Sequence, residues 1–454
     1  MRVCHSFTAA FDDPNLVSCA GLAPVLALAE QAGLARLVAE HVKIAKPAGV
    51  NAGVKVSCLV AGMVAGADSI TDMDLLRHGG MGRLFDGVRA PSTLGTFLRS
   101  FTFGHVRQLD AVASRLLVTL AAQTPLLPGA GQIAYIDVDD TVRSTFGYAK
   151  AGAGRGYTGV KGLNALIATI STPLAAPVIA AVRLRKGSTN SVRGAHRLVA
   201  DALVTATKAG GCGLRVLRAD SAFYNHQVIA ACGRHKASFS ITARQDCAVR
   251  KAIAGIDPNA WTSIKYTNAV FDTDQQRWIS QAEVAEVEYT AFTSRPKVER
   301  VTARLIVRRV PDLNPAHQDE LFTVHRYHAV FTNSPLSMLA AEKAHRGHAI
   351  VEQVIADLKD SALAHLPSGN FWANSAWLVC AAIAHNLTRA AGTAASPFHA
   401  KARTGTIRAQ LITVPGRLAR SARRLRLHLP TGWPWAYAFT QLADAARHGP
   451  TSAT

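Results

Sequence analysis

The order of strand-like and helix-like segments between residues 132 and 244 constrains the fold of this chain more than any other feature. Five runs are short and rich in β-forming residues: QIAYIDV, LNALIATIS, APVIAAVRL, GLRVLRAD and ASFSITAR. Two runs between them, VRGAHRLVADALVTATKA and NHQVIAACGRHK, have apolar residues at helical spacing. The order of three strands, a helix, a strand, a helix and a strand predicts a mixed α/β sheet built on a three-stranded meander.

The sequence on either side of this segment has a different texture. Residues 21 to about 125 have apolar residues at three-to-four spacing and almost no strand signal, which predicts a helical region. Between 246 and 333 further strand candidates follow one another, from SIKYTNAVF to ELFTVHRYHAVF, with no comparable helix among them. Helical spacing returns from 337, and FWANSAWLVCAAIAHNLTRAA is apolar nearly all round, so we expect it in a core.

An excess of basic residues points to a polyanionic partner. The chain has 50 Lys and Arg against 30 Asp and Glu, a formal net charge of +20. This favours nucleic acid first and an acidic membrane surface second. No apolar run reaches the roughly 18 to 20 residues that span a bilayer, and Asp12 and Asp13 stand where a signal peptide needs apolar residues, so we expect a cytoplasmic protein. Seven scattered cysteines without a C-x-x-C pair argue against a disulfide framework and against a zinc finger.

The segment RAPSTLGTFLRSFTFGHVRQLD is a first candidate for contacts with that partner. Pro91 and the N-cap candidate Ser92 open a short helix, and a second helix follows Thr102. With Arg99 and Arg107 nearby, the pair is compatible with a helix-turn-helix DNA reader. A plain helical hairpin would have the same pattern.

The C-terminal segment RRLRLHLP is a second candidate, because it alternates basic and apolar residues. The alternation predicts a strand with Arg424, Arg426 and His428 on one face and leucines on the other. A basic face suits contacts with phosphates. A charged edge that protects a sheet from further pairing would look the same.

Three aspartates lie inside the first strand-like run, AYIDVDDTVRS. Asp137 and Asp139 are two residues apart and point to one face, whereas Asp140 points to the other. Carboxylates are expelled from a buried strand unless something pairs with them. Asp220 ends the run LRVLRAD, and adjacent strands could bring Asp139 and Asp220 side by side, where they would repel unless a cation sits between them.

A further acid comes from the helical run AHRGHAIVEQVIADLK. Steps of three, four and seven residues put His345, His348, Glu352 and Lys359 on one polar stripe. A zinc site of the His-Glu-x-x-His type needs a different order of ligands. A solvated charged face is the simpler alternative.

Together these motifs resemble the DDE transposases of bacterial insertion sequences, which belong to the RNase H-like superfamily. The resemblance rests on D-x-D-x-T in DVDDT, on RADSAFY around Asp220 and on the helix pattern that ends in Glu352 and Lys359. It covers roughly residues 131 to 392, and the basic tail LITVPGRLARSARRLRLHLPTGWPW is similar too. The chain resembles the branch with a β-rich insertion, and within it the insertion-sequence family numbered thirteen-eighty.

The resemblance implies a catalytic site of three carboxylates, Asp139, Asp220 and Glu352. In the family motif the first catalytic acid normally precedes Thr or Ser-Thr, which favours Asp139 over Asp137. Asp137 is the reserve for this position. The three carboxylates would hold two Mg²⁺ or Mn²⁺ ions, which activate a water or a 3′ hydroxyl on one side of the scissile phosphate and stabilise the leaving oxygen on the other.

The resemblance also implies DNA contacts around that site. The branch signature has Tyr, Arg, Glu and Lys at steps of three, four and seven residues, whereas this chain has His345 and His348 at the first two positions. A hydrogen-bonding or protonated histidine could replace either phosphate-positioning residue, and Lys359 could hold a flanking phosphate. Trp278 in the β-rich segment would stack a flipped base or pack within its own segment.

The domains and the activity follow from the same resemblance. It implies an RNase H-like mixed sheet flanked by helices over 131–245 and 334–395, a β-rich insertion over 246–333, a helical DNA-binding domain over 1–130 and a basic tail over 396–454. The activity would be cut-and-paste transposition by a homodimer on the terminal inverted repeats of its element. An RNase H-like nuclease of another purpose and a catalytically inactive DNA-binding protein are the alternatives.

Overall fold

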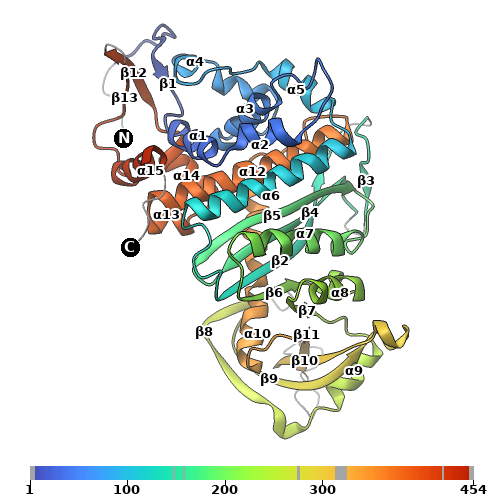
Figure 1. The fold of residues 1–454 in the computed structure, drawn as a ribbon. Coiled ribbons are helices and arrows are strands. Elements are labelled where there is room, and N and C mark those ends of the chain that lie inside the picture. The colour runs from blue at the N-terminus through green and yellow to red at the C-terminus, as the bar shows by residue number, and fades with distance from the viewer. Residues whose placement is uncertain are drawn as a thin grey trace. The chain divides into compact units, whose positions relative to one another are not determined.

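The computed structural model describes residues 6–146, 149–156, 159–272, 277–311, 325–421 and 424–448 (Figure 1). The chain divides into two compact units. One comprises residues 127–146 and 152–356 and contains the mixed sheet; the other comprises residues 1–126, 147–151 and 357–454 and is mostly helical. We call them the sheet unit and the helical unit.

The sheet unit is built on ten described strands. Nine of them follow the order β3-β4-β2-β6-β7-β11-β10-β9-β8, and β5 pairs with β4. Their bounds are β2 Ile133–Ser144, β3 Gly154–Arg155, β4 Lys161–Thr172, β5 Ala175–Lys186, β6 Leu214–Ala219, β7 Ser238–Thr242, β8 Thr262–Asp272, β9 Arg277–Ala291, β10 Val301–Pro311 and β11 His325–Thr332.

The first five long strands form the predicted arrangement. β2, β4 and β5 are the antiparallel meander, and β6 and β7 continue the sheet from β2 in parallel. Helices α7 (Ala195–Lys208) and α8 (His226–Arg234) provide the crossovers, and α7 packs on β4 and β5. Ile136, Asp137 and Val138 of β2 are 0% exposed, so the middle of the central strand is fully buried. The predicted fold class, a mixed α/β sheet with helices and a helical N-terminal region, is confirmed.

The strands of the β-rich segment continue the same sheet, because β11 pairs antiparallel with β7. The expectation that this segment has no helix is wrong, since α9 spans Cys247–Ala254. Asp246 caps it through its Oδ1, which accepts the Val249 amide at 3.0 Å. Eight residues are too few to establish a helical period in the sequence, so the cap was the available signal.

The predicted continuous helix after 337 is also wrong. The chain forms α10 (Met338–Arg346), a 3-10 turn over Gly347–Ala349 and α11 (Ile350–Lys359). Arg218 explains the glycine at the break, because a Cβ at Gly347 would lie 2.6 Å from its Nη1, which donates to the Ala344 carbonyl at 2.6 Å. The residues expected on one polar stripe therefore do not share one helix.

The helical unit is organised around α12 (Phe371–Ala395), which is buried along almost its whole length as predicted. Trp377 is 0% exposed, and its Nε1 donates to the Ala362 carbonyl at 2.6 Å. Helices α3 (Ala52–Ala65) and α6 (Phe103–Gln123) pack against α12 (Figure 1). No single helix in the described part of the chain is long and apolar enough to cross a membrane. The other helices are α1 Leu22–Gln31, α2 Leu34–His41, α3 Ala52–Ala65, α4 Met81–Leu84, α5 Pro91–Arg99, α6 Phe103–Gln123, α13 Pro397–Lys401, α14 Thr404–Ile407 and α15 Ala436–His448.

The two helices predicted around Thr102 are present as α5 and α6. Pro91 is the first helical residue of α5, so the cap is Ala90 and the predicted cap at Ser92 is wrong. Proline suits the first helical position because its φ is already helical and its missing N–H has no partner there. Thr102 forms a capping box with His105 at the start of α6. Whether the pair reads DNA stays a prediction.

A small antiparallel sheet joins the two ends of the helical unit. It has the order β1-β12-β13, with β1 at Leu16–Val17, β12 at Gly416–Ser421 and β13 at Arg424–His428. The strand predicted in the basic tail is therefore present as β13. Leu425 remains 44% exposed, so the apolar face of that strand is only partly covered.

Candidate active site

Asp137 in β2 is a fully buried carboxylate with a fixed cationic partner. Arg218 in β6 donates to it through Nε and Nη2, both at 2.7 Å, and the guanidinium also lies over the Tyr135 ring at 4.1 Å. The Ser171 hydroxyl and His348 Nδ1 complete its contacts at 3.4 and 3.0 Å. These contacts occupy the carboxylate oxygens of the reserve residue and compensate its charge.

Asp140 has a second buried arginine on the opposite face of the sheet, as predicted from strand alternation. It pairs with Arg185 and accepts a hydrogen bond from Asn164 Nδ2 at 2.9 Å. Arg185 also donates to the carbonyls of Ser191 and Arg193, just before α7. Asp140 therefore ties the sheet to the loop that enters α7.

Asp139 and Asp220 lie next to each other, as the sequence predicted. β2 and β6 are parallel neighbours, and Val138 is in register with Ala219. The next residue on each strand is the aspartate, and hydrogen-bonded strands lie about 4.8 Å apart. Asp139 therefore lies in the middle of β2, where its pairing with β6 ends, and Asp220 directly follows β6.

Asp139 differs from its two neighbours because it forms no ion pair among the described residues. Its Oδ1 accepts the backbone N–H of Asp140, at 2.7 Å. Burial raises the pKa of Asp139 to about 6; the Asp140 N–H and His348 act to lower it and Asp220 to raise it. Burial also raises the pKa of Asp220, although that carboxylate accepts the Ala222 N–H at 3.0 Å. Two adjacent carboxylates that resist ionisation fit a divalent cation, which would supply the missing positive charge.

Of the two remaining candidates, His348 lies close to this pair of aspartates and Glu352 does not group with it. His348 is half-buried, and it acts to lower the pKa of both Asp139 and Asp220. Glu352 is exposed in the first turn of α11. Within the described residues, no three His, Cys, Asp or Glu side chains form a group that could hold a metal ion. His348 thus lies close to Asp139 and Asp220, whereas Glu352 lines a cavity together with His348 but does not group with the two aspartates in the described structure.

His345 is part of the core of the sheet unit. Its ring lies between α10 and β7, where Nδ1 contacts the Ser240 hydroxyl at 3.0 Å and Nε2 contacts the Thr242 hydroxyl at 2.9 Å. Burial lowers the pKa of His345 to about 3. A neutral ring with both nitrogens engaged is suited to packing and not to a contact with a DNA phosphate.

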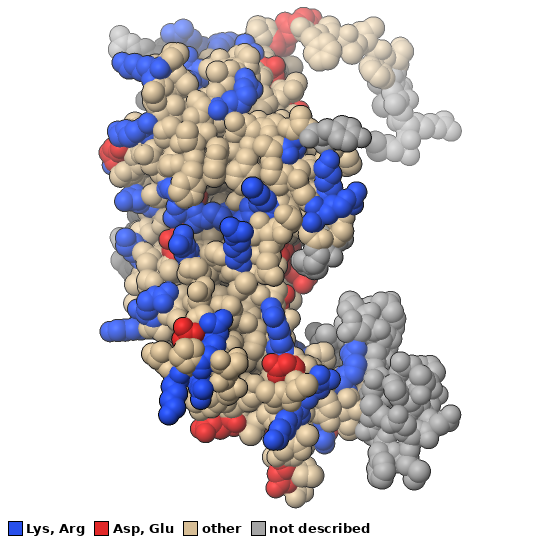
Figure 2. Space-filling model, turned by 90° about the vertical axis from the view of Figure 1, so that its right-hand side faces the viewer, with Lys and Arg blue, Asp and Glu red and all other residues tan. Residues whose placement is uncertain are grey.

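The other predicted DNA contacts lie in the helical unit. Lys359 is exposed at the end of α11, Arg99 is exposed at the end of α5, and Arg107 pairs with Asp110 at 2.8 Å. Arg426 is exposed in β13, and the side chain of Arg424 lies outside the described residues. Figure 2 shows Lys and Arg side chains spread over the face that it draws, with fewer Asp and Glu side chains among them.

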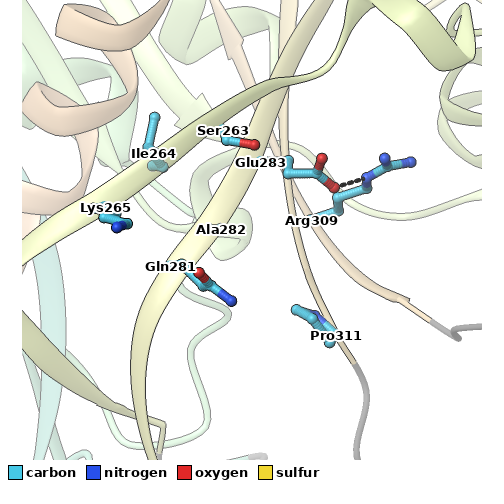
Figure 3. A pocket seen from close by; sticks show the side chains of 8 residues that line it. All are labelled: Ser263, Ile264, Lys265, Gln281, Ala282, Glu283, Arg309 and Pro311. Atoms are coloured by element: carbon cyan, nitrogen blue, oxygen red, sulfur yellow. Dashed lines mark hydrogen bonds and ion pairs between the residues drawn. The ribbon is translucent and has the colours of Figure 1, made fainter.

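The predicted base-stacking residue, Trp278, lies in β9, and its side chain is outside the described residues. Trp261, just before β8, packs against the Arg309 guanidinium at 4.1 Å and against the Tyr327 ring at 6.2 Å. Figure 3 shows the neighbouring cavity of about 480 Å³, where Glu283 of β9 pairs with Arg309 of β10 at 2.7 Å. Trp261 is therefore already engaged by its own segment.

The sequence did not reveal the residues that compensate the buried acids. Arg218 and Arg185 were visible only as charged residues within apolar strands. That position was itself the signal, since an arginine in a buried strand requires an acidic partner.

Comparison with known proteins identifies the family. No curated protein matches the chain. A family model described as Transposase DDE domain group 1 matches residues 4–450, nearly the whole length. Members of such families are DNA-processing enzymes that generally use divalent metals. The chain therefore belongs to the Transposase DDE domain group 1 family, and its function is in DNA transposition.

Proposed function

We propose that the protein binds the terminal inverted repeats of an insertion sequence and catalyses Mg²⁺-dependent cleavage and strand transfer, with Asp139, Asp220 and Glu352 as catalytic carboxylates. One observation carries the proposal. Of three aspartates in one buried strand, the two that flank the motif position are neutralised by arginines, whereas Asp139 has no such partner among the described residues and its pKa rises to about 6. Such an acid fits a cation site rather than a structural ion pair.

The residues around the site have separate roles in this proposal. Asp139 and Asp220 hold two Mg²⁺ or Mn²⁺ ions, and Glu352 completes the ligand set. The ions, when bound, supply Lewis-acid activation of the attacking oxygen and stabilise the leaving oxygen. The Asp137–Arg218 pair holds β2 and β6 in register, which keeps the two aspartates adjacent.

The protein also needs surfaces for DNA. Arg99, Arg107, Arg424, Arg426 and Lys359 are the proposed contacts in the helical unit, where they would supply affinity that does not depend on sequence. His348 is the proposed contact beside the carboxylates. The net charge of +20 supports such binding. We further propose membership of the insertion-sequence family numbered thirteen-eighty, cut-and-paste transposition by a homodimer on paired ends, and action on DNA in the bacterial cytoplasm.

The test is a strand-transfer assay with a labelled DNA duplex that carries one end of the element, in Mg²⁺. Asp139→Ala, Asp220→Ala and Glu352→Ala should each abolish joining. Asp74→Ala serves as the control, because Asp74 is a surface acid whose side chain is 55% exposed. Cleavage without joining would identify a nuclease instead.

The position of Glu352 favours a second candidate, a DNA-binding protein without catalytic activity. Its carboxylate is exposed and does not group with the two aspartates in the described structure. The same assay separates the two candidates, since binding without cleavage by the unchanged protein would support the inactive one.

A further inference from the structure

We propose that Arg218 is a positioning residue, which fixes the turn between α10 and α11 over the sheet and thereby sets the place from which Glu352 reaches the two aspartates. The inference rests on the proposed function, because it assigns a role within the same site. Arg218 belongs to β6 and is 4% exposed. The turn and Glu352 belong to the sheet unit, as Arg218 does.

Arg218 lies one step before the pair of aspartates, on the same face of the sheet. Asp137 of β2 and Arg218 are register partners in a parallel strand pair. Asp139 and Asp220 follow these residues by two positions, and Asp220 still has extended backbone, with φ −77° and ψ −178°. Residues two apart in an extended chain point to the same side. The ion pair and the aspartate pair are therefore neighbours along one face of β2 and β6.

The Arg218 guanidinium connects this face to the end of α10. Its Nε and Nη2 donate to Asp137, both at 2.7 Å. Its Nη1 donates to the Ala344 carbonyl at 2.6 Å, in the last turn of α10, where helix carbonyls lack donors of their own helix. The Tyr135 ring packs on the guanidinium at 4.1 Å. A planar group held in this way has one orientation, so it fixes the distance from the end of α10 to β2 and β6.

The glycine that follows α10 supports this assignment independently. Gly347 has φ −64° and ψ −5°, a right-handed helical conformation that other residues adopt readily. The backbone itself therefore does not require glycine at this position. A Cβ would lie 2.6 Å from Arg218 Nη1, so it is the close approach of the arginine that requires it.

The turn determines where Glu352 begins. His348 lies in the turn, with its Nδ1 3.0 Å from Asp137 Oδ1, and it is close to both catalytic aspartates. Glu352 follows four residues later, about 6 Å further along the helix axis. Its side chain is exposed, and exposed side chains change rotamer readily. A turn held in place by Arg218 thus gives the Glu352 carboxylate a fixed starting point for reaching an ion that the aspartates hold.

A purely structural role is the competing explanation, since Arg218 also compensates the buried charge of Asp137. Gly347→Ala separates the two roles, because it leaves both charged groups in place. The added Cβ must open a contact of 2.6 Å to an ordinary 3.4 Å, a shift of about 0.8 Å. Asp137 and Tyr135 hold the guanidinium, so the turn is what moves. A misplacement of about 1 Å is enough to slow catalysis about 100-fold.

The experiment uses the full chain and compares Gly347→Ala with Gly233→Ala. Gly233 is the matched control, because it lies in α8 of the same unit and a Cβ there meets nothing within 4 Å. Gly347→Ala should weaken Mn²⁺ binding, measured by calorimetry, about 10- to 100-fold, the range for residues that orient metal ligands. Single-turnover cleavage of a saturating duplex with the element's end should slow by about the same factor. Gly233→Ala should change neither.

A double substitution identifies Arg218 as the cause. Arg218→Lys keeps a positive charge beside Asp137 but removes Nη1, the atom that a Cβ at position 347 would meet. In that background Gly347→Ala should lower Mn²⁺ affinity and cleavage less than about twofold further, because the two residues act through one contact. Equal losses in both backgrounds, or no loss from Gly347→Ala alone, would overturn the proposal.

Hydrogen exchange separates a failure of this proposal from a failure of the proposed function. Gly347→Ala should speed amide exchange in the turn at least about threefold and leave β2 and β6 unchanged. Unchanged exchange in the turn would overturn the positioning role even if Glu352→Ala abolishes strand transfer. If the unchanged protein cleaves no DNA, the transposase function fails, and the Mn²⁺ affinities and exchange rates still decide the role of Arg218.

Discussion

Replacing Asp139 by asparagine should stabilise the metal-free protein at neutral and alkaline pH. The substitution keeps the shape of the side chain and the oxygen that accepts the Asp140 N–H at 2.7 Å. It removes a negative charge that burial disfavours and that no arginine among the described residues compensates. A buried carboxylate that destabilises the ligand-free protein is expected at a metal-binding site. It is not expected for an acid whose role is structural.

The pKa of Asp139 sets the size of the expected stabilisation. Its folded pKa of about 6 exceeds the reference value of 3.8, so the folded state binds more protons between these two values. Stability therefore falls as pH rises through this window, and the full penalty is present above it. A difference of about two pKa units corresponds to about 3 kcal/mol as an upper figure. For a domain of about 150 to 250 residues this raises the unfolding temperature by about 6 to 12 °C.

The assay is calorimetric unfolding in EDTA between pH 3.5 and 8. Asp139→Asn should unfold at a higher temperature than the unchanged protein at pH 8, and the difference should become small near pH 3.5, where the carboxyl is mostly protonated in both states. Asp137→Asn is the matched control, because it should shift stability the other way. It leaves the 4%-exposed Arg218 without a counter-charge, which costs about 3 to 5 kcal/mol.

An unfolding temperature of Asp139→Asn that is equal to or lower than that of the unchanged protein at pH 8 would refute this reasoning. The same conclusion would follow if both aspartates responded with the same sign. Asp139 would then be a structural acid like its neighbours.

Three further predictions concern the rest of the site. Adding Mn²⁺ to EDTA-treated protein should raise the unfolding temperature of the unchanged chain but not of Asp220→Asn, because the variant lacks a charged ligand; an equal rise in both would contradict this assignment. Glu352→Gln should abolish strand transfer and change the unfolding temperature by less than about 2 °C, since exposed side chains contribute little to stability; retained joining would exclude Glu352 from catalysis. His345→Gln should weaken the pH dependence of the free energy of unfolding between about pH 6.5 and 3, because unfolding lets the neutral ring take up a proton in that window. Denaturant titration at several pH values measures this dependence, and an unchanged dependence would count against a neutral ring.

The sequence predicted the central sheet well because its strands and helices have clear periodicity. β2, β4 and β5 appear in the expected order, as do α7 and α8 between the parallel strands. The adjacency of Asp139 and Asp220 followed from the same order, since each directly follows the paired segment of two parallel strands. The prediction was wrong where a short feature interrupted a longer pattern, as α9 and the turn at Gly347 show.

The sequence by itself determined the mixed α/β class, the basic character of the chain and the placement of two aspartates on neighbouring strands. These properties depend on local periodicity and composition, which a single chain displays directly. Only the tertiary structure decided which acid of AYIDVDDTVRS has no arginine partner among the described residues, because Arg218 and Arg185 reach Asp137 and Asp140 from other strands. The burial of His345 was decided at the same level. Charge compensation and burial depend on contacts between residues distant in sequence, and no local pattern contains them.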